Sequence, residues 1–221
     1  TSCSSLESTI TTTTTNTTTT TTTTTSSKSG AGHQRSISNK TDIVLWAYLS
    51  PAQLSLYRNF LESETVATTL NSTKSPLAAI AVLRKICSHP QIVKNSFMND
   101  DNIDSSISNN INTTTDDSLS IDALISDSGK LKVLLPLLKS HRREGHRTLI
   151  FSESRKMLDI IATILENRDF KFTRLDGTIV KITDRQEIID KFNNDKSYNV
   201  CLITTQVGGV GITLTGANRV S

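Results

Sequence analysis

Residues 128–221 alternate between helical and strand patterns, and this alternation constrains the fold more than any other feature of the chain. Leucines at helical spacing over 128–144 precede the apolar stretch 148–151, and two further pairs of helix and strand follow. The last strand, 200–203, is apolar at every position, which is typical of a strand buried on both faces. Strands that alternate with helices form parallel sheets with helical crossovers. The sequence therefore predicts an α/β fold built on a parallel sheet.

The composition divides the chain into four parts. Residues 1–39 contain an almost unbroken threonine tract and a Ser/Gly-rich stretch, which bury too little apolar surface to offset the entropy of ordering. We expect this part to be disordered, and we expect the same of a polar insertion at 94–127. Between them, 40–93 carries helical patterns, and 128–221 holds the α/β part.

The helical segment 40–93 begins each of its two helices near a proline. Ser50-Pro51 places proline at the first helical position, and Ser75-Pro76 repeats this arrangement. The second helix should end before His89-Pro90, because the residue before a proline disfavours helical backbone. Two helices are marginal alone, so they should pack on another part of the protein.

Charge, cysteine content and hydropathy exclude several classes of protein. The formal net charge of +3 and the pI near 8.8 permit nucleic acid as a partner without requiring it. The three cysteines lie far apart, which indicates neither a zinc cluster nor a disulfide framework. No apolar run approaches membrane-spanning length, so we expect a soluble intracellular protein with no membrane partner. Because the chain starts at Thr1, a targeting segment could precede it.

A glycine-rich stretch from Thr204 to Gly216 follows the apolar strand 200–203. It lacks the lysine of a Walker A loop and the spacing of a dinucleotide-binding fingerprint. Ser128-Gly129-Lys130 also fails as a Walker loop, because the earlier glycine and the hydroxyl residue are missing. The backbone N–H groups and hydroxyls of the glycine-rich stretch suit the close approach of a phosphate oxygen. A tight turn that needs positive φ is the alternative, and the glycines alone favour it.

Ligands of parallel sheets collect beyond the carboxyl ends of the strands. Three segments should therefore meet at one edge: 151–153, 175–178 and the glycine-rich stretch. The helix that follows 175–178 should begin with a capping box at residues 183–186. Asp176-Gly177 also suits a simple turn, and Arg185 suits a solvated helix face.

Six segments of the chain resemble, in the same order, the second half of the Swi/Snf-type ATPase motor. They are Leu83 to Pro90, Ser128 to Leu131, Thr148 to Glu153, Arg174 to Thr178, Arg185 to Asn193 and Thr204 to Val220. The similarity is closest to the PICH type, the polo-like-kinase-interacting checkpoint helicase, followed by the Cockayne syndrome group B type. The resemblance implies an incomplete RecA-like helicase C-terminal lobe, preceded by a helical segment that links the two lobes of the motor.

The resemblance also implies an activity and a set of DNA contacts. Motors of this kind belong to helicase superfamily two, bind ATP and Mg²⁺ between their lobes, and step along double-stranded DNA. The DNA-binding residues implied are Thr205, Gln206, Gly208, Gly209 and Gly211 in motif V, and Ser152, Asp176, Gly177 and Arg185 in motif IV and the following loop. His89 and Pro90 would be structural residues of the lobe junction. The family more often has glutamine at Glu153, where an acid would repel phosphate.

The family's catalytic motifs are missing from this stretch of sequence. It contains no Walker A box, no Asp-Glu pair of a Walker B box and no arginine-bearing motif VI. We therefore expect no catalytic residue and no metal ligand in it, and no ATPase activity of the fragment alone, because other segments of the intact protein would bind ATP and Mg²⁺. The intact protein would be nuclear and would act on double-stranded DNA in chromosome maintenance or DNA repair, with chromatin, mitotic or repair proteins as partners. The alternative is a non-catalytic DNA- or protein-binding polypeptide that retains one RecA-like lobe.

Overall fold

The computed structural model describes residues 11–15, 41–63, 66, 76–97, 120–208 and 211–221. The chain divides into two compact units, 1–48 and 49–221. In the first unit, β1 (Thr11–Thr15) pairs antiparallel with β2 (Asp42–Trp46). Strand β1 lies in the stretch expected to be disordered, and the rest of 1–39 lies outside the described residues. Strand β2 lies at the start of the segment expected to be helical, because its β-branched and aromatic residues favour an extended chain.

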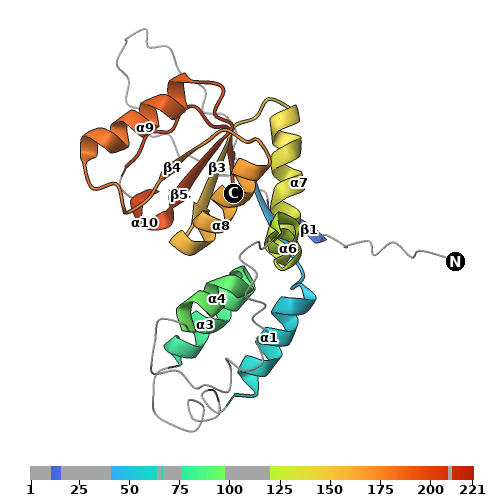
Figure 1. Cartoon of the computed structure of the whole chain (residues 1–221). Coiled ribbons are helices and arrows are strands. Elements are labelled where there is room, and N and C mark those ends of the chain that lie inside the picture. The colour runs from blue at the N-terminus through green and yellow to red at the C-terminus, as the bar shows by residue number, and fades with distance from the viewer. Residues whose placement is uncertain (1–10, 16–40, 64–65, 67–75, 98–119, 209–210) are drawn as a thin grey trace, which may run out of the picture. The chain divides into compact units, whose positions relative to one another are not determined.

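The second unit is built on a four-stranded parallel sheet with the order β4-β5-β3-β6 (Figure 1). Its strands are β3 (Thr148–Ser152), β4 (Phe172–Leu175), β5 (Val200–Thr204) and β6 (Arg219–Val220). Every residue of β5 is buried, and β5 pairs with β3 on one side and with β4 on the other. The predicted α/β fold is confirmed, and so is the central position of this strand.

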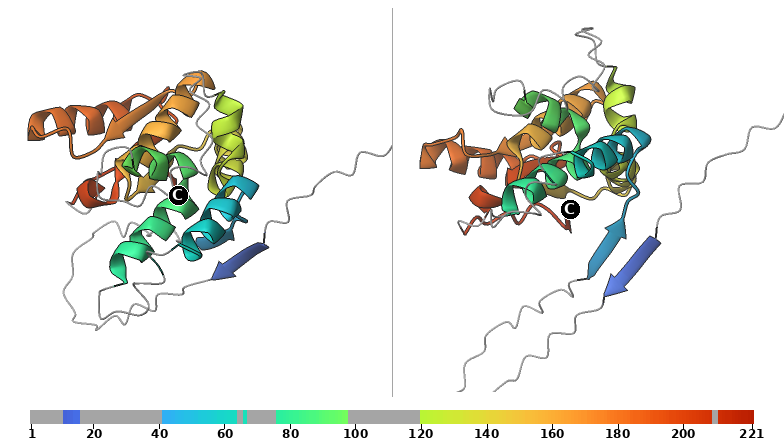
Figure 2. Two further views of the ribbon diagram at one scale, coloured as in Figure 1. Left: turned by 60° about the horizontal axis from the view of Figure 1, so that its bottom comes forward. Right: turned by 90° about the horizontal axis from the view of Figure 1, so that it is seen from below.

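Successive residues of the strands face opposite sides of the sheet, and each side has its own core. Ile150 and Leu202 pack with α7 (Gly129–Arg143) and α8 (Arg155–Asn167). Leu149 and Ile203 pack instead with α9 (Ile182–Asn194) and the short α10 (Thr205–Gly208). Helices thus cover both faces of the sheet, as Figures 1 and 2 show.

The start of α7 agrees with the helix predicted from residue 128, whereas the start of α9 differs from the prediction. The Ser128 and Ser154 hydroxyls accept hydrogen bonds from the first turns of α7 and α8. The capping box predicted at residues 183–186 is wrong, because α9 begins two residues earlier, at Ile182, with Lys181 as a cap that makes no side-chain hydrogen bond. Thr183 lies inside the helix, and its hydroxyl donates to the neighbouring Asp184 carboxylate at 3.1 Å.

The helical segment before the lobe consists of α1 (Pro51–Leu61), α3 (Leu77–Ser88) and α4 (Pro90–Phe97). Phe60, Ile86 and Val93 form its core. Ser50 and Gln53 form a complete capping box at the start of α1, with Pro51 as the first helical residue, as predicted. At α3 the arrangement is not repeated, since Pro76 is the cap and not the first helical residue.

A further helix, α6 (Ile121–Ser126), lies within 94–127, the range predicted as a polar disordered insertion. Leu124 is buried in the core formed by α7 and α8, and Ile121 and Ile125 pack against that core. Their spacing of three and four residues gives one apolar helix side, so disorder is the wrong interpretation for 121–126. Residues 98–119 lie outside the described residues.

Among the described helices, none has both the length and the apolar character needed to cross a membrane.

Candidate nucleic-acid interface

Three loops leave the sheet at the same edge. In the parallel register, Ser152 at the end of β3 lies beside Thr204 at the end of β5, and Leu175 at the end of β4 lies beside Ile203. The loops after these strands therefore begin level with one another. This places 153–154, 176–178 and the glycine-rich stretch at the carboxyl edge of the sheet, where parallel sheets bind their ligands.

One residue near the start of the glycine-rich stretch, Val207, is buried and anchors it to the core. Val207 is 6% exposed and packs in the core beneath α9, whereas Thr205 and Gln206, between the end of β5 and this anchor, are exposed. Gly208 is the last residue of α10, and Gly209 lies outside the described residues. Gly211 has φ of +62°, so the turn requirement that the sequence suggested applies at this glycine. Thr205 and Gln206 thus present their side chains to solvent, and their contact with DNA stays a prediction.

The end of the glycine-rich stretch is held by α9. Asn193 donates from Nδ2 to the Thr213 carbonyl and accepts at Oδ1 from the Gly216 N–H. Arg147, at the start of β3, stacks over the Phe192 ring and donates to the carbonyls of Phe192 and Tyr198. No local pattern indicated this cluster, because Arg147 and Asn193 meet only when β3 and α9 pack together.

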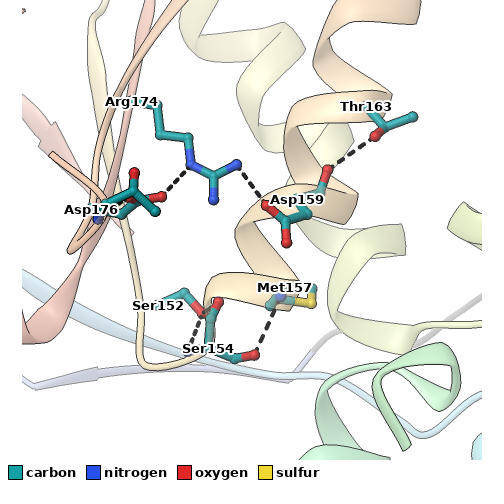
Figure 3. A network of polar contacts seen from close by, with 8 residues as sticks. Ser152, Ser154, Met157, Asp159, Thr163, Arg174 and Asp176 are labelled. Carbon is teal, nitrogen blue, oxygen red and sulfur yellow. Dashed lines mark hydrogen bonds and ion pairs between the residues drawn. The ribbon is translucent and has the colours of Figure 1, made fainter. Parts of the chain in front are cut away.

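The loop after β3 is a tight serine turn followed by an ion pair. The Ser152 hydroxyl accepts from the Ser154 N–H and donates to the Ser154 carbonyl, both at 3.2 Å (Figure 3). Ser154 in turn caps α8 by accepting from the Met157 N–H at 3.3 Å. Glu153 lies 3.2 Å from Arg84 of α3, and both side chains are largely exposed. The Arg84 guanidinium therefore offsets the negative charge that made a DNA contact at this loop unfavourable.

Asp176, predicted to bind DNA, is 2% exposed and engaged within the protein. Its Oδ2 accepts from Arg174 Nε at 2.7 Å, and its Oδ1 accepts from the Thr178 N–H at 2.8 Å and from the Thr178 hydroxyl. Burial alone would raise the pKa of Asp176, but the hydrogen bonds from Thr178 and Arg174 outweigh it, so the pKa is lower than that of an ordinary aspartate. The carboxylate shapes the turn, and the exposed neighbours Gly177 and Thr178 face solvent.

Arg185 also acts within this loop. It is half-buried on α9, and its Nε donates to the Ile179 carbonyl at 2.7 Å. The guanidinium thus ties the start of α9 to the end of the 176–178 turn. Its contact with DNA stays a prediction, with part of its donor capacity already used.

His89 and Pro90, predicted as structural residues, are both buried where α3 passes into α4. His89 Nδ1 accepts from the Gln91 N–H at 3.1 Å, which leaves Nε2 to donate to the Leu124 carbonyl at 2.9 Å. Burial lowers the pKa of His89, and the Leu124 carbonyl and Asp127 offset this only in part. The imidazole is therefore neutral and joins the helical segment to α6.

Gln53 is the centre of the same junction and was not singled out by the sequence. Its Oε1 accepts from the N–H groups of Ser50 and Gly129, each at 3.0 Å, and its Nε2 donates to the Ile86 carbonyl at 2.9 Å. The side chain is fully buried, and both its oxygen and its nitrogen are hydrogen-bonded. Because Gln53 occupies the Gly129 N–H, the start of α7 at Ser128-Gly129-Lys130 is closed to a phosphate.

The described residues do not form a nucleotide or metal site. The start of α7 is occupied as above, and among the described residues no three His, Cys, Asp or Glu side chains lie close enough together to hold a metal ion. The residues at hand therefore do not fit ATP and Mg²⁺ by themselves. The feature at the carboxyl edge that suits a ligand is its set of exposed residues, Gly177, Thr178, Thr205 and Gln206.

Solved structures share this architecture. The C-terminal part of the Fun30 ATPase domain has a TM-score of 0.58 and 26% identity, and the alignment covers 79% of this chain and 72% of that one. The Sulfolobus solfataricus SWI2/SNF2 ATPase core in complex with dsDNA has a TM-score of 0.59 and 23% identity, with 79% of this chain and 32% of that one covered. The second likeness, at its lower identity, shows the fold alone.

Comparisons of the amino-acid sequence show which known proteins the chain is similar to. Residues 129–221 match the helicase conserved C-terminal domain. The Danio rerio DNA excision repair protein ERCC-6-like is 43% identical over 193 residues, which are 84% of this chain and 13% of that protein. The chain is thus similar to SWI2/SNF2 ATPases, and its residues 129–221 match a helicase conserved C-terminal domain. The ERCC-6-like relative supports the Cockayne syndrome group B type, and the PICH type stays a prediction. Because the chain spans 13% of that relative, the activity of the whole protein is a matter of proposal.

The helicase C-terminal domain thus contains two kinds of site residue. Thr205, Gln206 and Gly177 were found from motifs, and they are exposed at the edge. Arg174, Asp159 and Asn193 were missed, and they hold the loops in place through side-chain contacts. One signal was available: Arg174 and Asp176 are two residues apart along an extended chain, which puts them on the same face.

Proposed function

We propose that this chain is the DNA-engaging second lobe, with the helices before it, of an ATP-dependent motor that translocates on double-stranded DNA. The observation that carries the proposal is the level ending of β3, β4 and β5, which brings exposed residues with hydroxyl, amide and backbone N–H groups (Gly177, Thr178, Thr205 and Gln206) to one edge. Groups of this type bind phosphate oxygens and carry no base specificity. The Sulfolobus solfataricus neighbour was solved in complex with dsDNA, which supports DNA as the ligand.

The charges at this edge are compatible with a polyanion. Of the described acids at or near this edge, Glu153 is paired with Arg84, and Asp176 and Asp159 share Arg174. An unpaired carboxylate beside a DNA phosphate would repel it. These acids are therefore paired with arginines of the same chain, and the hydroxyl and amide groups that the edge exposes carry no charge.

The remaining parts of the motor are assigned to other segments of the intact protein. ATP and Mg²⁺ would bind there, because the described residues offer neither a free helix start at α7 nor a metal-binding cluster. The excision-repair name of the ERCC-6-like relative supports a nuclear role in DNA repair or chromosome maintenance, with chromatin, mitotic or repair proteins as partners.

The proposal is tested by Thr205→Ala in the intact protein, with duplex affinity and DNA-stimulated ATP hydrolysis as readouts. Loss of one phosphate hydrogen bond should weaken duplex binding by about fivefold, equally on duplexes of different sequence. Ser126→Ala removes an exposed hydroxyl from α6 and should leave the affinity unchanged. An intact protein that binds no duplex and hydrolyses no ATP would overturn the proposal and leave the non-catalytic alternative.

A further inference from the structure

Arg174 joins the loop after β4 to helix α8 (Figure 3). Its Nε donates to Asp176 Oδ2 at 2.7 Å, and its Nη1 lies 2.7 Å from Asp159 Oδ1. Asp176 starts the loop after β4, whereas Asp159 belongs to α8, the helix into which the loop after β3 leads. One guanidinium thus binds a carboxylate of the loop after β4 and a carboxylate of α8.

The two ends of this bridge have different surroundings. The Asp176 side chain is 3% exposed, and its second oxygen holds Thr178, so its position is fixed by the protein. The Asp159 side chain is 57% exposed, so its carboxylate lies at the surface of α8. Arg174 therefore connects a buried, fully paired carboxylate to a surface helix.

We propose that Arg174 is a positioning residue that fixes the loop after β4 relative to α8, so that the loops after β3 and β4 engage one DNA backbone together. The inference rests on the proposed function and adds to it how the loops after β3 and β4 are held at fixed positions relative to each other. It assigns Asp176 and Asp159 to support of the loops and assigns no phosphate contact to either carboxylate.

The chemistry of arginine suits this task better than that of lysine. A guanidinium is planar and presents donors along two edges, so it can bind two carboxylates at once, whereas an ammonium is a point charge on a flexible chain. Burial alone would lower the pKa of Arg174, but its hydrogen bonds to Asp159 and Asp176 outweigh this and raise it. The guanidinium therefore stays charged at every pH at which the two carboxylates are ionised.

The first test is Asp159→Asn in the intact protein, with the dissociation constant for a DNA duplex as readout. Removing a negative charge near DNA should tighten binding if only long-range electrostatics matters. A positioning role predicts the opposite, a weakening of about two- to fivefold. Glu166→Gln is the matched control, because it removes the same charge from an exposed side chain of the same helix, and it should not weaken binding. Binding by Asp159→Asn that equals or exceeds that of Glu166→Gln would overturn the inference.

The second test is Arg174→Gln, which removes the positive charge, with the salt dependence of DNA binding as readout. Removing one phosphate-binding cation lowers the slope of log affinity against log salt by about one. A positioning residue should weaken binding and keep the slope, and combining the substitution with Asp159→Asn should weaken binding little further. A slope reduced by about one would show that Arg174 itself contacts phosphate and would contradict the inference.

Failure of the inference and failure of the proposed function give different results. If the unmodified intact protein binds no duplex, the proposed function fails. If it binds duplex and both variants match it, only the positioning role fails. A thermal melt of each variant accompanies these measurements, and weaker binding that merely follows a smaller folded fraction would count against the positioning role.

Discussion

Asn193 Oδ1 accepts a hydrogen bond from the Gly216 N–H at 3.0 Å, which fastens the end of the glycine-rich stretch to the last turn of α9. The same amide donates from Nδ2 to the Thr213 carbonyl at 3.2 Å. One side chain thus satisfies a donor and an acceptor of a segment that pairs with no strand at those residues. The position of this segment therefore depends on α9 as well as on β5.

Asn193→Ala should loosen the segment at 213–216, because two backbone groups would be left without their partner. We expect faster amide hydrogen exchange at Gly216 and a loss of about 1–2 kcal/mol in the free energy of unfolding of the chain. Asn193→Asp keeps the acceptor for Gly216 and should lose less protection there. Asn194→Ala, at the exposed neighbouring position, is the control, and exchange at Gly216 that is the same in both alanine variants would contradict the role of Asn193.

Gly216→Ala should destabilise the chain, because a Cβ at this position would lie 2.7 Å from Arg147 Nη1 and 3.1 Å from the Asn193 Cα atom. Arg147 cannot simply move away, since its guanidinium is held by the Tyr198 and Asp195 carbonyls. We expect a loss of about 1–3 kcal/mol, measured by chemical denaturation.

Gly177→Ala is the matched comparison for this prediction. A Cβ on Gly177 would meet no atom within 4 Å, and its φ is not in the left-handed region. The substitution should therefore leave the stability almost unchanged. Equal losses at Gly216 and Gly177 would show that the crowding around Arg147 does not matter.

The fold followed from local patterns, whereas much of the site support did not. The apolar run at 200–203 predicted the central strand, and Ser128 predicted the start of α7, because burial and capping are visible in neighbouring residues. Gln53 and Gly129 are 76 residues apart, so no local pattern shows that they meet. The sequence predicted Thr183 as the cap of α9, but the helix begins at Ile182 and its cap is Lys181. Asp176 sits in a motif expected to face DNA, and only the folded chain shows that its oxygens are taken by Arg174 and Thr178.

The 221-residue chain alone should hydrolyse no ATP, with or without DNA. Phosphoryl transfer needs a group that cradles the phosphates, acids that hold Mg²⁺ and an arginine that stabilises the transition state. Among the described residues, the start of α7 is closed by Gln53, and no acidic cluster is present. Phosphate release by the purified chain above the rate of a heat-inactivated sample would show that this assignment is wrong.

Gln53→Leu should be among the most destabilising single changes in the helical segment. It would leave the N–H groups of Ser50 and Gly129 and the carbonyl of Ile86 buried without a partner. Unpaired buried groups cost about 1–3 kcal/mol each, so the melting temperature should fall by several degrees. Gln186→Leu, at an exposed position on α9, is the control. If both variants melt alike, the Gln53 junction does not hold the segment to the lobe.

His89 should make the stability of the chain depend on pH below neutrality. Burial holds its pKa below the ordinary value of 6.5, so the folded protein keeps it neutral while the unfolded chain takes up a proton. The contribution of His89 to the free energy of unfolding is therefore fully present above pH 6.5. It decreases as the pH falls from there toward the lowered pKa, because the unfolded state then binds more protons than the folded state. Protonation would also remove the Nδ1 acceptor that holds the Gln91 N–H.

The measurement is chemical denaturation of the chain at several values of pH between about 7 and about 5, compared with His89→Gln. The variant can still donate to the Leu124 carbonyl, and it should start less stable and lose less stability over this range. Asp176 does not interfere, because its pKa is lowered from 3.8 and its contribution is lost only in more acidic solution. His141, whose pKa is also lowered, mainly by burial, titrates in the same direction, so His141→Gln is measured in parallel. If the unmodified chain and His89→Gln lose stability with the same slope, the buried imidazole is not the group that senses the acid.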